Sequence, residues 1–209
     1  DEALIRAVVG WVDLRSERLE EQLSELAPHP KFKGVRHVVQ DEPDDRFMLG
    51  EAFLNGISKL RQFGLTYDIL IYPKQLPAAI ELARSFPDQS FILDHIAKPH
   101  IREGSLAPWQ EQIRELSQAR NVSCKVSGMV TEANRCDWKA EDFQPYFDVV
   151  FEAFPAERLM WGSDWPVCLL AGKYEEVYRL VDDYSQQFDV SQQEALFGGT
   201  AARVYGIAD

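Results

Sequence analysis

The stretch Arg158-Leu-Met-Trp-Gly-Ser-Asp-Trp-Pro166 joins a short apolar run to a polar turn. We predict a buried strand at 159–162 and a turn that presents Asp164 and is closed by Pro166. A carboxylate at the tip of a buried strand is costly unless it is paired or used. The alternative is an Asp that caps the next helix. Proline disfavours helical backbone at the residue before it, Trp165, which argues against a helix that begins at Asp164.

The same order of apolar run, polar tip and helix recurs five more times upstream. We predict strands at 7–13, 33–40, 65–72, 90–95, 122–128 and 159–162. We predict helices from Ser16 onward and at 46–63, 77–86, 108–119, 141–154, 174–187 and 191–205. Short strands that alternate with helices imply a parallel sheet with right-handed crossovers.

Two architectures fit this alternation, an open doubly wound sheet and a TIM barrel. No strand is followed by a Gly-x-Gly-x-x-Gly or P-loop motif, so the nucleotide-binding form of the open sheet lacks its main support. A barrel gathers all strand tips at one rim. The tips in this chain are rich in reactive groups, namely Arg36-His37, Tyr72, Asp94-His95, Lys125 and Ser163-Asp164.

The composition of the chain limits the classes of partner that it can bind. The 209 residues are 45% hydrophobic and 27% charged, and we treat 1–209 as a single domain. The net charge of −12 argues against a nucleic-acid partner, and no apolar run is long enough to predict a membrane span. The chain opens without a basic signal-peptide region, and its three widely spaced cysteines suggest reduced thiols. We therefore expect a cytoplasmic protein and leave a homo-oligomer open.

Two of the four histidines, His37 and His95, lie at predicted strand ends. A lone histidine at a strand end is more often structural, but two of them that face a strand-end Asp in the same fold favour a chemical role. Strand neighbours point to opposite sides, so we expect His95 to face the site and Asp94 to point outward or to support a neighbouring loop. His95 and Asp164 would supply an electrophile and a general base. Lys98 adds a cation nearby, with a surface lysine as the alternative.

Five stretches resemble one family in order and cover nearly the whole chain. They are Gly-Val-Arg-His-Val-Val-Gln-Asp-Glu (34–42), Leu-Asp-His-Ile-Ala-Lys-Pro (93–99), Cys-Lys-Val-Ser-Gly-Met-Val-Thr-Glu (124–132), the opening motif extended to Cys168, and Gly-Gly-Thr-Ala-Ala-Arg-Val-Tyr-Gly (198–206). Together they resemble the sugar-lactonase branch of the amidohydrolase superfamily, with its L-fuconolactonase- and L-rhamnonolactonase-like enzymes.

The resemblance implies a (β/α)8 barrel that opens a sugar lactone of the L-fucono-, L-rhamnono- or L-galactono- type. It implies that Asp164 activates water and that His95 polarises the carbonyl or binds a metal. It also implies substrate contacts at Arg36 and His37. We predict further substrate contacts at Tyr72, Lys98 and Trp165.

The chain departs from the family pattern at its start, because it contains no His-x-His motif. We count about six of the eight strand-helix units and expect an N-terminally incomplete barrel with an open seam. Any metal, such as one zinc ion, would have only His95, Asp164 and at most His37 as ligands unless a His-x-His strand is supplied. The alternatives are a hydrolase or decarboxylase for another small acid, or an inactive barrel fragment.

Overall fold

A computed structural model describes residues 4–207, and one curled parallel sheet organises them. Its strands are β1 (Val8–Gly10), β2 (Phe32–Val38), β3 (Thr66–Leu70), β4 (Phe91–Leu93), β5 (Val122–Val126) and β6 (Leu159–Trp161). Each strand pairs in parallel with the next one in the sequence, so the order is β1-β2-β3-β4-β5-β6. A doubly wound sheet reverses its strand order at a switch point, whereas a barrel does not. The consecutive order therefore confirms the barrel architecture.

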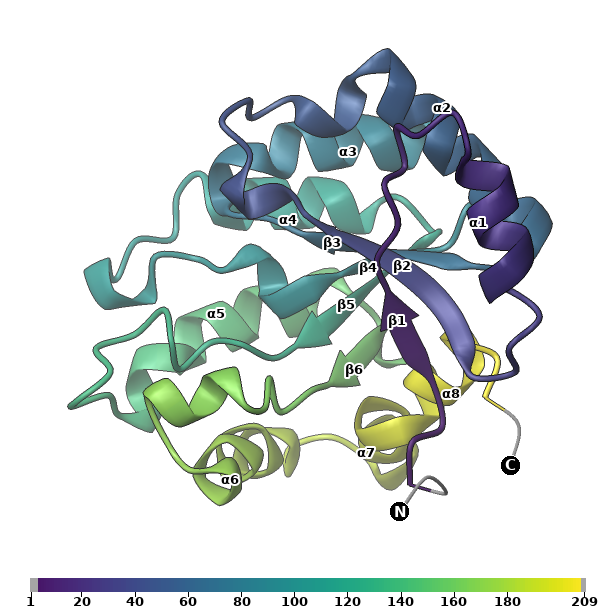
Figure 1. Ribbon diagram of the computed structural model, residues 1–209. Coiled ribbons are helices and arrows are strands. Elements are labelled where there is room, and N and C mark those ends of the chain that lie inside the picture. The colour runs from purple at the N-terminus through teal and green to yellow at the C-terminus, as the bar shows by residue number, and fades with distance from the viewer. Residues whose placement is uncertain (1–3, 208–209) are drawn as a thin grey trace.

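The barrel is open on one side in the described part of the chain, because β1 and β6 are the two edges of the sheet and do not pair with each other. Figure 1 shows the six strands curling partway round, with β1 and β6 on either side of the gap. This confirms the expected six of eight strand-helix units.

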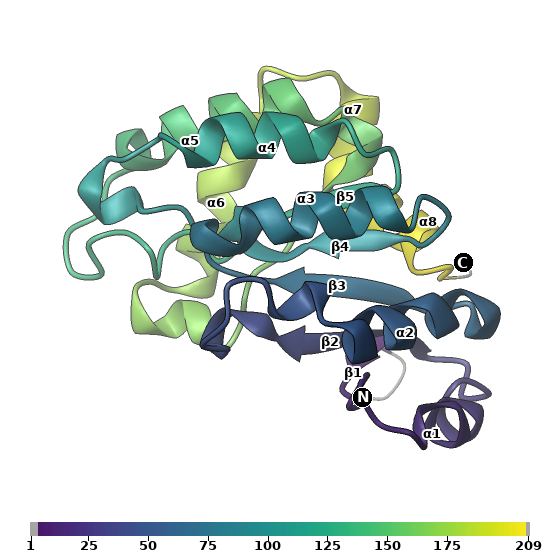
Figure 2. The same cartoon turned by 90° about the horizontal axis from the view of Figure 1, so that it is seen from above.

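Helices cover the convex face of the sheet, except for the last one, which packs beneath it. They are α1 (Leu19–Leu26), α2 (Glu51–Leu60), α3 (Leu76–Ser85), α4 (Trp109–Ser117), α5 (Ala140–Ala153), α6 (Tyr174–Ser185), α7 (Val190–Glu194) and α8 (Thr200–Val204). In α2, Phe53, Ile57 and Leu60 recur at helical spacing and are fully buried against the sheet. Figure 2 shows α3, α4 and α5 side by side outside the strands. Among the described helices, none is both long and apolar enough to cross a membrane.

Two predicted helices were wrong in their extent. The helix predicted at 46–63 is interrupted at Gly50, whose extended backbone precedes α2. The closing helix predicted at 191–205 is divided into α7, a wide turn at Ala195–Gly199 and α8. Gly198 interrupts the helix with φ 177°, a value outside the helical range. The break lets α8 turn beneath the sheet instead of continuing along its outside.

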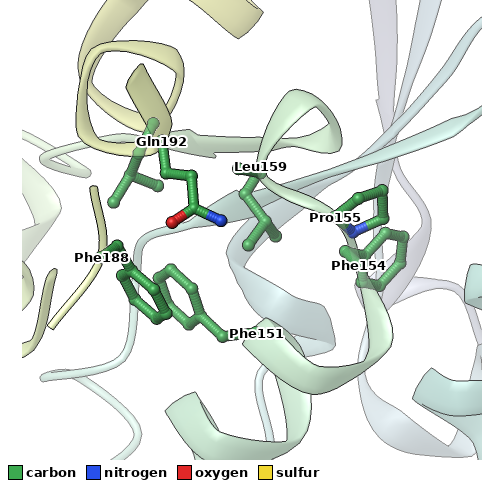
Figure 3. A pocket seen from close by; sticks show the side chains of 8 residues that line it. Phe151, Phe154, Pro155, Leu159, Phe188 and Gln192 are labelled. Atoms are coloured by element: carbon green, nitrogen blue, oxygen red, sulfur yellow. The ribbon is translucent and has the colours of Figure 1, made fainter. Parts of the chain in front are cut away.

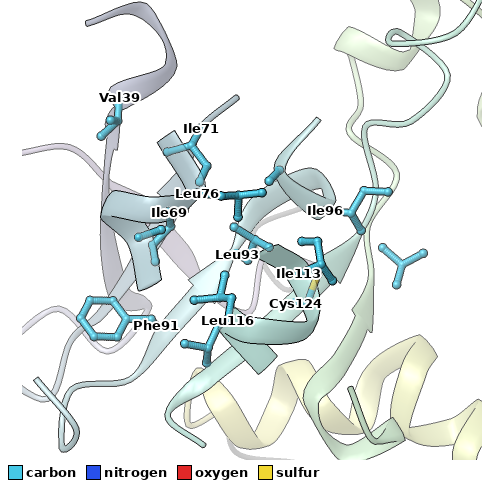
Figure 4. Close-up of a cluster of buried hydrophobic side chains, with 14 of the residues drawn as sticks. Val39, Ile69, Ile71, Leu76, Phe91, Leu93, Ile96, Ile113, Leu116 and Cys124 are labelled. Carbon is cyan, nitrogen blue, oxygen red and sulfur yellow. The ribbon is translucent and has the colours of Figure 1, made fainter. Parts of the chain in front are cut away.

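Alternation along the strands produces two apolar layers of unequal size. The large layer lies between the convex face and the helices, and Figure 4 shows part of it around Ile69, Leu93 and Ile113. The small layer lies on the concave face, where Ile92 of β4 and Met160 of β6 pack with Tyr205 from just beyond α8. The segment that follows the helix break therefore covers the inside of the curled sheet.

Candidate active site

Asp164 and His95 meet at the carboxyl ends of β6 and β4. The His95 Nε2 atom lies 3.6 Å from Asp164 Oδ1, and the two side chains are 11% and 13% exposed. These residues are 69 positions apart in the chain, and only the curl of the sheet brings them together. The prediction that His95 and Asp164 lie on one rim is thus confirmed.

The backbone at both tips adopts a left-handed conformation that favours glycine, although neither residue is glycine. Asp164 has φ 55°, and the four consecutive residues from His95 to Lys98 have φ between 47° and 60°. The left-handed region costs a non-glycine residue roughly 1–2 kcal/mol. Ile96 is β-branched, which makes its φ of 47° especially unfavourable. Such strain persists where the surrounding structure imposes it, and it is concentrated at functional sites.

This left-handed turn corrects our prediction for Asp94. Strand β4 ends at Leu93, so the alternation that would have turned Asp94 away from the site ends before it. The Asp94 carboxylate is fully buried and receives a hydrogen bond from Arg36 Nη1 at 2.9 Å. Its other oxygen lies 2.8 Å from Lys125 Nζ. Both Asp94 and His95 therefore face the interior.

An ion cluster, formed by Arg36, Asp68, Asp94 and Lys125, lies on the concave face below the site, and both of its carboxylates are buried. Lys125 Nζ donates to Asp68 Oδ2 at 2.5 Å, and the Tyr205 hydroxyl donates to the same oxygen at 2.6 Å. Burial disfavours the charge on Lys125, but Asp94 and Asp68 outweigh it and raise the pKa of Lys125 well above its ordinary value. Two cations and two carboxylates thus neutralise one another inside the sheet.

The two carboxylates of the cluster are not equivalent. Burial raises the pKa of Asp68, and the nearby Lys125 opposes this only in part. Burial also acts against the Asp94 carboxylate, but Lys125, His95 and Arg36 together hold the pKa of Asp94 below its ordinary value. Asp94 is therefore the firmly ionised member, and Asp68 is the one that protonates more readily.

The imidazole of His95 is neutral at pH 7. Burial disfavours its charged form and lowers the pKa of His95, although the carboxylates of Asp94 and Asp164 act in the opposite direction. The Nδ1 atom lies 2.8 Å from the Ser127 hydroxyl oxygen, just beyond β5. Gly128 is packed behind the ring, where an added Cβ would lie 2.6 Å from the His95 Cγ and Nδ1 atoms. A neutral, tightly held imidazole can donate or accept one hydrogen bond at its free nitrogen.

The other predicted substrate residues separate into two groups. Arg36 lies on the concave face, and Lys98 Nζ lies 5.4 Å above the ring of Tyr72 on the same rim. Trp165 follows Asp164 and is 64% exposed. These four lie at the ends of strands or in the loops that follow them, as predicted.

The structure does not bring His37 to the site. Its Nε2 atom lies 2.6 Å from Glu42 Oε1, and its ring stacks on Phe47 with centroids 5.0 Å apart. The ring also meets Phe53 of α2 edge-on, which places it on the convex side. Strand alternation allows only one of Arg36 and His37 to face inward, and the structure selects Arg36.

The site also contains residues that the sequence analysis did not select. Asp68 interrupts the apolar run of β3. A carboxylate inside a buried strand is a signal in the sequence, and the alternation of inward and outward residues along the strand could have revealed it. Ser127 and Tyr205 carry no such signal, because serine and tyrosine are ordinary in those settings. Glu132 adds a carboxylate beside Lys98, and burial raises the pKa of Glu132.

The donor set for a metal ion is incomplete in this part of the protein. His95 Nε2 and an Asp164 oxygen are two suitable donors, and a catalytic zinc site uses about three protein ligands. Across residues 4–207, no three His, Cys, Asp or Glu side chains converge as a metal site would require. The residues described here therefore do not fit a zinc ion by themselves.

A separate apolar pocket lies at the far side of β6, between the end of α5 and α7. Figure 3 shows Phe151 and Phe188 against Gln192, with Leu159, Phe154 and Pro155 along the other wall. None of its lining side chains is titratable, so it offers no acid, base or nucleophile. The reactive groups are at the rim with His95 and Asp164.

Comparison with known proteins gives consistent results. A family model described as Amidohydrolase matches residues 3–207. An L-fucono-1,5-lactonase of Burkholderia multivorans is 40% identical over 223 residues, which cover 100% of this chain and 74% of that protein. An L-fucono-1,5-lactonase of Burkholderia ambifaria is 36% identical over 209 residues, covering 98% of this chain and 72% of that protein.

A solved structure is similar over the same extent. The crystal structure of an amidohydrolase from Burkholderia multivorans with bound zinc matches with a TM-score of 0.94 and 40% identity. The match covers 100% of this chain and 76% of that one. The curled sheet described above is therefore part of the architecture that these proteins share.

Proposed function

The chain belongs to the amidohydrolase family, and from this premise we propose that it is a hydrolase that opens a sugar lactone, of which L-fuconolactone is the first candidate. The observation that carries the proposal is the Asp164 carboxylate 3.6 Å from a neutral imidazole at the barrel rim. The two lactonases at 36–40% identity support the choice of substrate class. An intact base and electrophile argue against an inactive fragment.

The reaction follows from these two side chains. Asp164 accepts a proton from a water molecule as its oxygen attacks the lactone carbonyl carbon. The Nε2–H group of neutral His95 donates to the carbonyl oxygen, where negative charge develops. The bond from the carbonyl carbon to the ring oxygen then breaks, and the proton held by Asp164 passes to the leaving alkoxide. The product is the open-chain sugar acid.

The substrate hydroxyl groups would be held by donors around this centre. The side chain of Arg36 is 41% exposed and uses Nη1 for Asp94, so its guanidinium has further N–H groups available for substrate hydroxyls. Lys98 and Tyr72 form one wall, and Trp165 offers an apolar face to the sugar ring. A small sugar lactone is thus the proposed partner, bound by a single domain at 1–209.

Two broader assignments belong to the same proposal. The cysteines of the described residues are free thiols, which supports a cytoplasmic location. One related structure contains zinc, but His95 and Asp164 are only two donors, so no step of the mechanism above uses a metal.

Replacing Asp164 with Asn tests the proposal. Asn has nearly the same size but cannot accept the proton, so the rate of lactone opening falls on the order of 100- to 10,000-fold with little change in melting temperature. Proton release from L-fuconolactone, L-rhamnonolactone and L-galactonolactone measures the rate. A matched control is Asp137→Asn in an exposed loop, which should leave the rate unchanged. If Asp164 is only a cap, D164N melts earlier and still hydrolyses lactones, and the mechanism fails.

A further inference from the structure

The hydroxyl group of Ser127 is the hydrogen-bonding partner of the inner nitrogen of His95. Ser127 Oγ lies 2.8 Å from Nδ1, and Ser127 is 1% exposed, so no bulk water competes for this contact. The residue follows β5, whose neighbours are β4 and β6, the strands that carry His95 and Asp164. Ser127 therefore lies between the two strand tips that supply the reactive groups.

The remainder of the ring is closely confined. An added Cβ at Gly128 would lie 2.6 Å from the His95 Cγ and Nδ1 atoms, closer than side-chain carbons approach one another. Gly128 itself has φ +65°, a backbone conformation that suits glycine. The imidazole is thus fixed at one face by the Gly128 backbone and at Nδ1 by the Ser127 hydroxyl, which leaves Nε2 as its only free nitrogen.

The direction of the Ser127 contact decides what Nε2 can do. A neutral imidazole carries its proton on one nitrogen and a lone pair on the other. If Nδ1–H donated to Ser127, the Nε2 lone pair would face the Asp164 carboxylate at 3.6 Å, lone pair against negative charge. If the Ser127 hydroxyl donates to Nδ1, the proton is on Nε2 and faces the carboxylate favourably. The second arrangement is the stable one.

We propose that Ser127 is a positioning residue that donates its hydroxyl hydrogen to His95 Nδ1 and thereby keeps the proton on Nε2, from which a hydrogen bond is donated to the lactone carbonyl oxygen. The kinetic part of this inference rests on the proposed lactone hydrolysis, and the tautomer itself does not. A backbone carbonyl or carboxylate at the place of Ser127 would hold the proton on Nδ1 and leave Nε2 without a hydrogen to donate. A hydroxyl group can instead donate its own hydrogen to Nδ1 and leave the imidazole proton on Nε2.

The first test measures the tautomer in the unmodified protein. Nitrogen-15 spectra of metal-free protein labelled at histidine distinguish a protonated from an unprotonated ring nitrogen, and His95→Gln identifies the His95 signals among the four histidines. We expect a protonated Nε2 and an unprotonated, hydrogen-bonded Nδ1. A proton on Nδ1 overturns the proposal. This measurement needs no substrate, so it stands even if the protein hydrolyses no lactone.

The second test separates the hydroxyl from the shape of the side chain. Ser127→Ala removes the donor, and kcat should fall about 10-fold, the factor that one lost hydrogen bond commonly represents, with KM nearly unchanged. Ser127→Thr retains the hydroxyl, and Ser127→Val has the shape of threonine without the hydroxyl. The kcat of S127T should therefore exceed that of S127V by a similar factor. Ser123→Ala is the matched control with an unchanged kcat, because Ser123 is a buried serine within β5 that alternation directs to the same side as Lys125.

The outcomes are distinct. A S127A protein with wild-type kcat overturns the positioning role, even if its melting temperature is lower. A lower kcat in S127A together with an active S127T and a protonated Nε2 supports it. Wild-type protein without lactonase activity contradicts the proposed function alone, because the tautomer measurement still decides the role of Ser127.

Discussion

Replacing Lys125 with Met should destabilise the protein more than any surface charge change of the same kind. Lys125 Nζ lies 2.5 Å from Asp68 and 2.8 Å from Asp94, both of which are buried. Met has a similar length but no charge, so Asp68 would keep only the hydroxyl groups of Tyr205 and Thr66, and Asp94 would keep only Arg36. Breaking a buried ion pair from one side costs about 3–5 kcal/mol. Urea denaturation at pH 7 measures this loss in the free energy of unfolding.

The loss should depend on pH in a defined direction. Burial already raises the pKa of Asp68, and without Lys125 it rises further. A carboxyl whose folded pKa lies above its unfolded value stabilises the fold at low pH and loses that contribution as pH rises through the window between the two values. The deficit of K125M relative to wild type should therefore shrink as pH falls from 7 toward the ordinary Asp range near about 4.

Two comparisons make the result specific. Lys74→Met removes an exposed ion pair of similar length, 2.7 Å to Asp45, and should cost less than about 1 kcal/mol. The double variant Asp68→Asn/Lys125→Met removes the unpaired charge and should recover part of the stability lost in K125M. A loss in K125M below about 1 kcal/mol, or a deficit equal at every pH, would refute the view that the ion cluster holds the concave face together.

Three further changes test the site directly. Arg36→Met should raise KM on the order of 10-fold with kcat nearly unchanged in lactone assays, because its contacts to hydroxyls exist in both ground and transition states. Gly128→Ala should lower kcat, because the added carbon presses on the His95 ring. Gly64 is the control, since it has a similar φ of +66° and nothing within 4 Å of an added carbon, so Gly64→Ala should leave kcat unchanged. Equal kcat values for the two variants would contradict the close packing. Burial lowers the pKa of His95, so the ring stays neutral and the rate at about pH 6 should remain close to the rate at pH 7; a pH–rate profile that falls by half near 6.5 would contradict this.

The sequence allowed the sheet and the strand tips to be predicted, because each tip is a polar residue that directly follows an apolar run. Asp164 and His95 could be assigned to one rim on this basis, since parallel strands share the edge at which they end. The choice between Arg36 and His37 could not be made. Alternation shows that the two residues face opposite sides, but it does not show which side is the interior.

Asp94 shows a second limit, because its direction depends on where β4 ends. A left-handed turn usually has a glycine or asparagine as its sequence signal, yet the turn from His95 to Lys98 contains neither. Tyr205 shows a third limit, because its partner Asp68 is 137 positions away, beyond any local pattern. Both features depend on tertiary contacts that hold the backbone and side chains in place.

The hydrogen bond from Tyr205 to Asp68 also sets the order in which the interior is completed during synthesis. A ribosome that adds about 5–20 residues per second needs on the order of ten seconds to proceed from Asp68 to a residue 137 positions later. Over that interval the growing chain has the strand that carries Asp68, but not the segment that covers it. The carboxylate then lacks its hydrogen bond from Tyr205, and the small apolar layer around Ile92 and Met160 lacks its cover. The small apolar layer is therefore covered late in synthesis, when the segment around Tyr205 folds beneath strands that are already paired.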